Sequence, residues 1–215
     1  MKGFYKAGGS EFSHIDLSDL GCHTTTKTFP RRTIIMSEGE LYGFVYIILA
    51  GNVKVYMRGK SDNELILGIY GPGDLIGELS LFEESPALTS AVTLHLSKVL
   101  QVPKEEIKKQ AIQDSWLACY LLGKSTSQIR TLTERLRDLA LTDVYDRVTK
   151  ILINSATPEA DCLVIDHPLS QQHIAGMVGA SQAMVSKIFK ELSLGGYIDV
   201  AADKITINKR LPKAW

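Results

Sequence analysis

The stretch Asp114–Leu141, with the sequence DSWLACYLLGKSTSQIRTLTERLRDLAL, decides how this chain is organised. Read as one helix, it carries residues at alternating steps of four and three, which is the a/d spacing of a coiled coil. Those residues are Ala118, Leu122, Ser125, Ile129, Leu132, Leu136 and Leu139. Charged residues flank the second half of this stripe, as they do on the solvated side of a coiled coil. We therefore predict a dimerisation helix over residues 114–141; an ordinary core helix is the alternative.

Leucine and isoleucine side chains of this stripe would meet a partner helix. We predict the dimer interface at Leu122, Ile129, Leu132, Leu136 and Leu139. A second apolar face, at residues 116–121, exists only in the first turns, so the front half of the helix can also pack on what precedes it. This arrangement divides the chain into an N-terminal domain (residues 1–113), the helix (114–141) and a C-terminal domain (142–215).

Length and composition narrow the class of protein. The chain has 215 residues, enough for two modest domains, and its 24 basic side chains equal its 24 acidic ones, so net charge favours neither a nucleic-acid nor a membrane partner. No apolar run approaches the roughly 18 residues that cross a membrane. Residues 1–19 lack the apolar segment of a signal peptide. We expect a cytoplasmic protein with no membrane partner.

The cysteines and the known catalytic motifs give mainly negative information. Cys22, Cys119 and Cys162 lie far apart and form no C-x-x-C pair, which argues against a structural zinc site and a disulfide framework. We therefore expect no metal. The sequence also lacks G-x-S-x-G, H-E-x-x-H and G-x-x-x-x-G-K-[ST], so we do not expect an enzyme.

The N-terminal domain changes character from Lys27 onward, where short apolar segments alternate with glycines. This pattern predicts a small closed or rolled sheet, preceded by a short helix at Phe12–Leu20. The expected strands are Arg32–Ile35, Val45–Leu49, Asn52–Met57, Leu65–Tyr70, Ala91–Leu94 and Ser97–Val102. Pro103 should end the last strand, and helical structure should begin within Glu105–Gln110.

The segment Gly71–Phe82, with the sequence GPGDLIGELSLF, is unusual within this domain. Ile76–Leu79 can form a tight turn into a short helix, whose first backbone N–H groups would bind an anion. The carboxylate of Glu78, beside them, could accept a hydrogen bond from a ligand hydroxyl. A glycine turn inside a sheet, with no ligand, is the alternative interpretation of the same residues.

Two short helices joined by a tight turn are the central pattern of the C-terminal domain. Ser170 can cap the first helix, Gly179 can end it in the left-handed conformation, and Ser181 can cap the second helix. A helix at Val144–Asn154 and a loop at Ala156–Asp161 should precede the pair. These features predict a helix-turn-helix.

A hairpin, Tyr197–Val200 with Lys204–Ile207, follows the second helix and would form a wing. Polar residues of both helices suit double-stranded DNA, because Gln, Lys and Ser can reach base edges and Lys can contact phosphates. We predict DNA contacts at Ser170, Gln171, Ser181, Gln182, Ala183, Ser186, Lys187 and Lys190. For a lone helix, a solvated face would be the alternative.

In this order, the segments resemble the Crp/Fnr family of bacterial transcription regulators over almost the whole chain. Ser37–Glu40 with Val45–Gly51 resembles the first signature of the family's β-roll, and Gly71–Glu84 resembles its phosphate-binding cassette. Leu139–Val144 resembles its hinge, and Val178–Val185 its helix-turn-helix. The resemblance implies an α+β fold with an N-terminal cyclic-nucleotide-binding β-roll, a long dimerisation helix and a C-terminal winged helix-turn-helix. It also implies a homodimer that reads a palindromic promoter site and recruits RNA polymerase.

The resemblance also implies ligand contacts, which the chain matches incompletely. The candidate ligand-binding residues are Gly77, Glu78, Leu79, Thr89 and Thr133, with Glu78 placed to hold a ribose hydroxyl. The phosphate-binding arginine of cyclic AMP-binding relatives falls at Leu88, and their adenine-binding threonine falls at Leu132. Loss of a charge-assisted hydrogen bond, worth about 1.5–3 kcal/mol, would weaken binding roughly 10- to 100-fold. We expect a cassette with the family's shape but without its cyclic AMP chemistry, which takes another nucleotide-like effector or none.

The expected function is a dimeric DNA-binding transcription regulator gated by a small ligand in the β-roll. A regulator that needs no ligand is one alternative. Another is a haem- or redox-sensing regulator, for which Cys22, His23, His95 and Cys119 are available but form no cluster in the sequence. Gln182, Ala183 and Lys187 replace the Arg-Glu pair and the Arg of cyclic AMP-responsive relatives, so the preferred half-site should differ from theirs.

Overall fold

The computed structural model describes residues 24–59, 63–159, 162–166 and 169–212. It has a mixed α+β fold that separates into two compact units. The roll unit contains the described residues up to Met57 together with Ile66–Thr131, and the winged-helix unit contains Arg58–Leu65 and the residues from Leu132 onward. The helix expected at Phe12–Leu20 lies outside the described residues.

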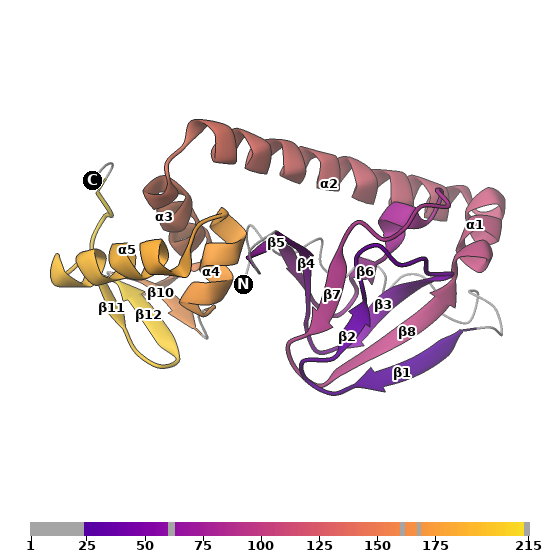
Figure 1. Cartoon of the computed structure of the whole chain (residues 1–215), viewed down its shortest axis with the longest axis horizontal. Coiled ribbons are helices and arrows are strands. Elements are labelled where there is room, and N and C mark those ends of the chain that lie inside the picture. Colours follow the sequence, from indigo (N-terminus) through magenta and orange to yellow (C-terminus); the bar gives the residue numbers. More distant parts are fainter. Residues whose placement is uncertain (1–23, 60–62, 160–161, 167–168, 213–215) are drawn as a thin grey trace. The chain divides into compact units, whose positions relative to one another are not determined.

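Two four-stranded sheets form the roll, with the strand orders β1-β8-β3-β6 and β2-β7-β4-β5 (Figure 1). The strands are β1 (Thr25–Phe29), β2 (Ile34–Met36), β3 (Phe44–Ala50), β4 (Val53–Arg58), β5 (Glu64–Tyr70), β6 (Leu75–Ile76), β7 (Ser90–Thr93) and β8 (Ser97–Pro103). The six strands expected from the sequence are therefore present. Strands β1 and β6 were not expected, because β1 is polar and mostly exposed and β6 has only two residues.

Strand β3 explains how the roll is held together. Its continuous apolar run is buried on both faces, as the absence of polar alternation predicts. Val45 and Ile47 pack in one apolar cluster with Leu117 of the long helix, whereas Tyr46 and Ile48 pack in a second cluster with the other sheet. Strand β3 thus contributes to both clusters: one lies between the two sheets, and the other lies between the roll and the helices.

Two helices follow the last strand of the roll, α1 (Lys104–Gln113) and α2 (Ser115–Leu141). Asp114 separates them in extended backbone conformation, and its Oδ1 accepts a hydrogen bond of 2.9 Å from the backbone N–H of Trp116. Leu117 and Leu121 are the buried residues of α2. The predictions of one long helix, and of a front half that packs on the preceding domain, are confirmed.

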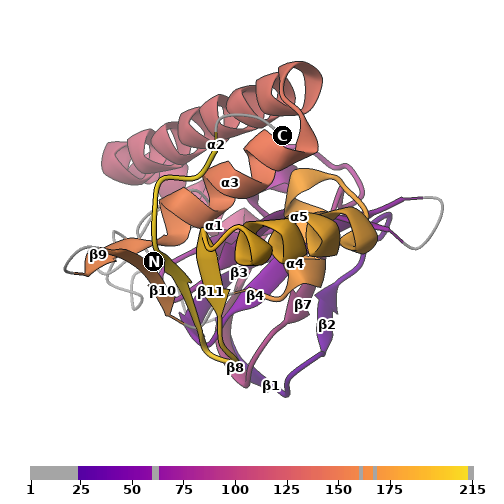
Figure 2. The same cartoon turned by 90° about the vertical axis from the view of Figure 1, so that its left-hand side faces the viewer.

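The winged-helix unit combines three helices with a four-stranded sheet in the order β11-β12-β10-β9. Its elements are α3 (Val144–Ser155), β9 (Thr157–Glu159), β10 (Cys162–Asp166), α4 (Gln171–Val178), α5 (Gln182–Leu194), β11 (Ile198–Val200) and β12 (Lys204–Ile207). Figure 2 shows α3, α4 and α5 close together, with the hairpin β11–β12 alongside α5. The prediction of a wing after the second helix of the pair is confirmed.

One expected loop was wrong. Residues 157–159, placed in the loop Ala156–Asp161, form β9, which pairs antiparallel with β10. Pro158 made a strand look improbable, because proline cannot donate to a sheet. It is tolerated here because β9 is the edge strand of its sheet, where one row of N–H groups has no strand to meet.

Local caps define the helix pair as the sequence predicts. The Oγ of Ser170 accepts a 3.2 Å hydrogen bond from the N–H of His173, and the Oγ of Ser181 accepts one of 3.2 Å from Met184. Gly179 ends α4 in the left-handed conformation, with φ of 64°. In the part of the chain that the structure describes, no helix has the length and apolar content needed to span a membrane.

Candidate ligand and DNA contact sites

The cassette, residues 71–84, contains the tight turn into a short helix that its glycines predict. Gly77 has φ of 89° and precedes the 3-10 helix η3 (Glu78–Ser80). This left-handed conformation favours glycine, since a Cβ would crowd the following carbonyl. The Oγ of Ser80 donates to the carbonyl oxygen of Gly77 at 3.3 Å, and Leu81, buried in the roll, ends the turn.

Asp74 fixes the cassette to strand β3. Its buried carboxylate accepts a 2.8 Å hydrogen bond through Oδ2 from the N–H of Gly71. Backbone bonds join the same segment to Ile48, whose N–H donates to Asp74 and whose carbonyl accepts from Gly73. The residues that lead into the turn at Gly77 are therefore held against strand β3, which positions Glu78.

Glu78 is held by the long helix as well as by its own turn. Its Oε1 accepts a hydrogen bond from the Nε2 of Gln128 on α2. Burial raises the pKa of the Glu78 carboxyl; the hydrogen bonds from Gln128 and from the backbone of Glu78 and Gly77, and the charge of Lys124, act in the opposite direction. The Glu78 carboxyl group is thus shielded from water but surrounded by hydrogen-bond donors.

A buried lysine supports the other end of η3. Lys104, at the start of α1, is 9% exposed, and its Nζ donates a 2.8 Å hydrogen bond to the Oγ of Ser80. Burial lowers the pKa of this ammonium group because a charge in an apolar environment is disfavoured. No sequence pattern indicates this contact, because it joins residues 24 positions apart.

The remaining candidate ligand residues differ in their surroundings. Leu79 and Leu88 are exposed, at 50% and 63%, whereas Thr89 is buried beside the start of β7. Thr133 is exposed on α2, in the part of that helix that belongs to the winged-helix unit. The structure therefore brings Gly77, Glu78 and Leu79 together on one turn and adds Gln128, which the sequence did not identify.

The DNA-facing candidates lie mainly on α5. Ser181, Gln182, Ala183, Lys187 and Lys190 are exposed. Their exposure leaves this face of α5 open to a partner, as base reading in a groove requires.

Two further features qualify that surface. The Oγ of Ser186 donates a 2.6 Å hydrogen bond to the Oε1 of Gln171, so these two candidates on α4 and α5 are bonded to each other. The Nζ of Lys187 lies 4.0 Å from a carboxylate oxygen of Glu191 one turn later. Lys190 carries no such ion pair among the described residues, which suits a contact with a phosphate.

Comparison with known proteins decides the family. The family model of the cyclic nucleotide-binding domain matches residues 26–114, and that of the Crp-like helix-turn-helix domain matches residues 146–210. The CRP-like cAMP-activated global transcriptional regulator of Mycobacterium tuberculosis is 32% identical over 184 residues, which cover 84% of this chain and 82% of that protein. The chain belongs to the Crp/Fnr family.

Other proteins match over similar lengths. The CRP-like protein Clp of Xanthomonas campestris is 26% identical over 198 residues, 86% of this chain and 84% of that protein. The solved structure of the c-di-GMP responsive regulator CLP of Xanthomonas campestris has a TM-score of 0.76 at 23% identity and covers 87% of this chain and 95% of that one. FixK2 from Bradyrhizobium japonicum has a TM-score of 0.72 at 21% identity, covering 87% and 93%. At these identities the structural likenesses establish the fold alone.

Membership of the Crp/Fnr family makes this chain a DNA-binding transcription regulator. Its helix-turn-helix is the pair α4–α5, and its α+β fold is the expected β-roll, long helix and winged helix-turn-helix. The relative from Mycobacterium tuberculosis is a transcriptional regulator by name, not an enzyme. Among the described residues, no three His, Cys, Asp or Glu side chains are grouped as metal ligands, and Cys119 and Cys162 are free thiols.

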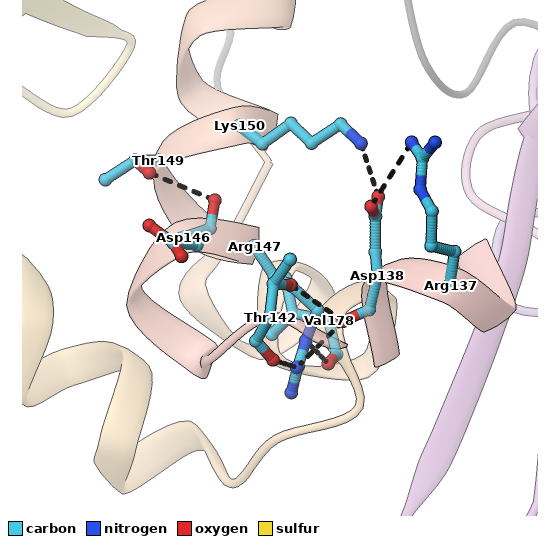
Figure 3. A network of polar contacts seen from close by, with 8 residues as sticks. All are labelled: Arg137, Asp138, Thr142, Asp146, Arg147, Thr149, Lys150 and Val178. Atoms are coloured by element: carbon cyan, nitrogen blue, oxygen red, sulfur yellow. Dashed lines mark hydrogen bonds and ion pairs between the residues drawn. The ribbon is translucent and has the colours of Figure 1, made fainter. Parts of the chain in front are cut away.

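The Crp/Fnr hinge contains a polar network that the sequence did not reveal (Figure 3). The Nη1 of Arg147 donates to the carbonyl oxygen of Thr142 at 2.5 Å, and its Nε donates to that of Val178 at 2.9 Å. Asp138, on the last turn of α2, pairs with Lys150 on α3. One guanidinium group therefore joins the hinge to the C-terminal end of α4, where carbonyl groups lack helical partners.

The predicted dimer stripe of this Crp/Fnr protein is exposed along α2. Its five large apolar residues are between 42% and 68% exposed: Leu122, Ile129, Leu132, Leu136 and Leu139. Because they recur at steps of three and four, they lie on one narrow face of the helix.

Proposed function

We propose that this regulator acts as a homodimer whose two copies of α5 read the two halves of a palindromic promoter site, and that a nucleotide-like ligand at the cassette changes its affinity for that site. We also propose that the bound dimer recruits RNA polymerase, as its family membership suggests. The observation that carries the proposal is the exposed apolar stripe on α2.

The stripe supports a dimer because burying its apolar side chains against a second copy would be favourable in free energy. Each large aliphatic side chain contributes about 1.5–3 kcal/mol when it is fully buried, and five such residues recur here at coiled-coil spacing. A second copy of α2 offers a self-complementary stripe through a two-fold axis. Two-fold symmetry in turn favours a palindromic site, with half-sites about 34 Å apart along the duplex.

Ligand gating rests on the cassette and on one relative. Glu78 occupies the turn that matches the family's cassette, in the region of the cyclic nucleotide-binding model. The relative from Mycobacterium tuberculosis is described as cAMP-activated. A ligand would shift DNA occupancy only by its differential affinity for two arrangements of the dimer.

Sedimentation and gel-shift measurements on the full chain test the proposal. We expect a dimer at micromolar concentration, and an affinity for promoter DNA that falls steeply as salt rises, because bound phosphates release counterions. A single sedimenting copy, even with the target duplex present, would contradict the dimer. Tight DNA binding that no cyclic nucleotide alters would leave a ligand-independent regulator.

A further inference from the structure

From Leu88 to Thr93, the last residue of strand β7, the chain carries no basic side chain that could neutralise a phosphate. Leu88 stands two residues before β7, at the position where cyclic AMP-binding relatives have arginine, and it is 63% exposed. Lys104 is a poor substitute for that arginine, because its ammonium group is buried and already donates to the Oγ of Ser80, which in turn donates to the carbonyl oxygen of Gly77. A further positive charge near the turn at Gly77 would come from another element.

The helix α2 presents such a charge. Tyr120, Lys124 and Gln128 recur every four residues and so lie on one face of α2. Tyr120 packs against the apolar core of the roll, and Gln128 donates to Glu78 in the cassette. Lys124 lies between them on that face, with its Nζ 5.5 Å from the centre of the Tyr120 ring, and its charge acts on Glu78.

We propose that recognition of a nucleotide at this cassette is shared with α2: Lys124 neutralises the ligand's phosphate in place of the missing arginine, and Gln128 holds Glu78 until the ligand's ribose hydroxyl takes its place. The inference rests on the proposal that the cassette binds a nucleotide. It assigns two specificity-determining residues to α2, the helix that also carries the candidate Thr133, whereas Leu88 lies in the segment before β7.

The two roles are chemically distinct and can be separated. A carboxylate only accepts hydrogen bonds, so the Nε2 of Gln128 and a ribose hydroxyl are competing donors to Glu78. A phosphate carries the ligand's negative charge, so its attraction to the Lys124 ammonium does not depend on that hydroxyl. Removing the 2′-hydroxyl from the ligand should therefore abolish the effect of Gln128 but preserve the effect of Lys124.

Calorimetric titration of the full-length protein tests both roles. The probes are 3′,5′-cyclic AMP, 3′,5′-cyclic GMP and the 2′-deoxy form of each. The variants are Lys124→Met and Gln128→Ala, with Lys109→Met and Thr131→Ala as controls at exposed positions of α1 and α2. Far-UV circular dichroism establishes that each variant is folded.

We expect Lys124→Met to weaken binding of the nucleotide, with or without its 2′-hydroxyl, by roughly 10- to 100-fold, while Lys109→Met changes nothing. Gln128→Ala should tighten binding of the ribose form by about 3- to 10-fold, because the competing donor is gone, and leave the 2′-deoxy form unchanged. Thr131→Ala should affect neither form.

Three results would overturn the inference. They are no binding of either nucleotide by wild-type protein up to millimolar concentration, equal affinities of Lys124→Met and Lys109→Met, and an equal effect of Gln128→Ala on both ligand forms. Gel shifts with promoter DNA, run on the same samples without nucleotide, separate this failure from that of the proposed function. If the protein still binds DNA as a dimer, the proposed function holds and only the roles of Lys124 and Gln128 are rejected.

Discussion

At the scale of single residues, Glu78 has a proposed role in ligand binding and also affects the stability of the roll through its ionisation. Burial raises its pKa, so the folded state favours the protonated carboxyl more than the unfolded chain does. The stabilising contribution of that protonated group is fully present below the ordinary pKa of 4.5 and is lost as pH rises through the raised folded value. Ionisation of Glu78 therefore opposes the stability of the folded state, which supports the proposal that this glutamate serves ligand recognition.

The substitution Glu78→Gln tests this linkage. A glutamine mimics the protonated acid and can still accept from Gln128, so we expect it to increase the free energy of unfolding at neutral pH. Below pH 4.5, where the wild-type carboxyl is protonated in both states, the difference should vanish. Urea unfolding across a pH series measures it; an equal change at acidic and neutral pH would show that the effect is not one of ionisation.

Two lysines of α5 are expected to have different roles in DNA binding. Lys187, one turn into the helix, is placed to read a base, so Lys187→Ala should weaken the preferred site by about 1–3 kcal/mol and relax its sequence preference. Lys190→Ala should weaken all DNA about equally and reduce the slope of log affinity on log salt by about 1. Gel shifts with matched and scrambled duplexes distinguish them. If both variants lose affinity without any change in preference, α5 reads bases with other residues.

At the scale of elements, we expect the hydrogen bonds of Arg147 to stabilise the hinge (Leu139–Val144) more than the ion pair between Asp138 and Lys150 does. The guanidinium group donates to carbonyl oxygens of Thr142 and Val178 (Figure 3), and hydrogen bonds from a charged donor contribute about 1.5–3 kcal/mol. Arg147→Met should therefore lower the free energy of unfolding by about that amount. Lys150→Met, which removes the partly exposed ion pair with Asp138, should cost only about 0–1 kcal/mol. Chemical denaturation compares the two variants, and equal losses would contradict this ranking.

The turn between α4 and α5 depends on the glycine that ends α4. Gly179 has φ of 64°, and a Cβ placed there would lie 3.1 Å from the Cδ2 of Leu139. We expect Gly179→Ala to destabilise the protein by about 1–2 kcal/mol, the cost of the left-handed conformation for a residue with a side chain. Gly123→Ala is the control, because Gly123 lies within α2 with no atom near its missing Cβ, and alanine should stabilise that helix by about 0.5–1 kcal/mol. Thermal unfolding should shift in opposite directions for the two variants.

The elements differ in how far the sequence predicts them, and the difference follows from the range of the interactions. Ser170, Gly179 and Ser181 define α4 and α5 through contacts within a few residues, so their roles were predictable. Strand β9 exists because of its pairing with β10 across a turn, and the local signal of Pro158 pointed the other way. The contact between Glu78 and Gln128 spans 50 positions, and only the packing of α2 on the roll reveals it.

At the scale of the whole molecule, the proposed function requires two copies, because one helix-turn-helix reads only half of a palindrome. The proposed dimer would cover Leu122, Ile129 and Leu136, each of which is more than 60% exposed on one face of α2. A ligand bound at the roll could then influence DNA binding through a helix that both functions share. This coupling needs a helix pair that has two arrangements, not a rigid connection.

The decisive substitution at this scale is Leu136→Glu, with Thr131→Glu as its control. Both residues are exposed on α2, but only Leu136 belongs to the stripe. In a dimer the two-fold axis would bring two buried carboxylates close together and remove two leucines from the interface, so the association constant should fall on the order of 100-fold or more. Sedimentation equilibrium measures it, and the affinity for a palindromic duplex should fall in parallel while affinity for a single half-site stays unchanged. If Leu136→Glu sediments and binds DNA like Thr131→Glu, the stripe is not the dimer contact, and the exposed apolar face of α2 must have another partner.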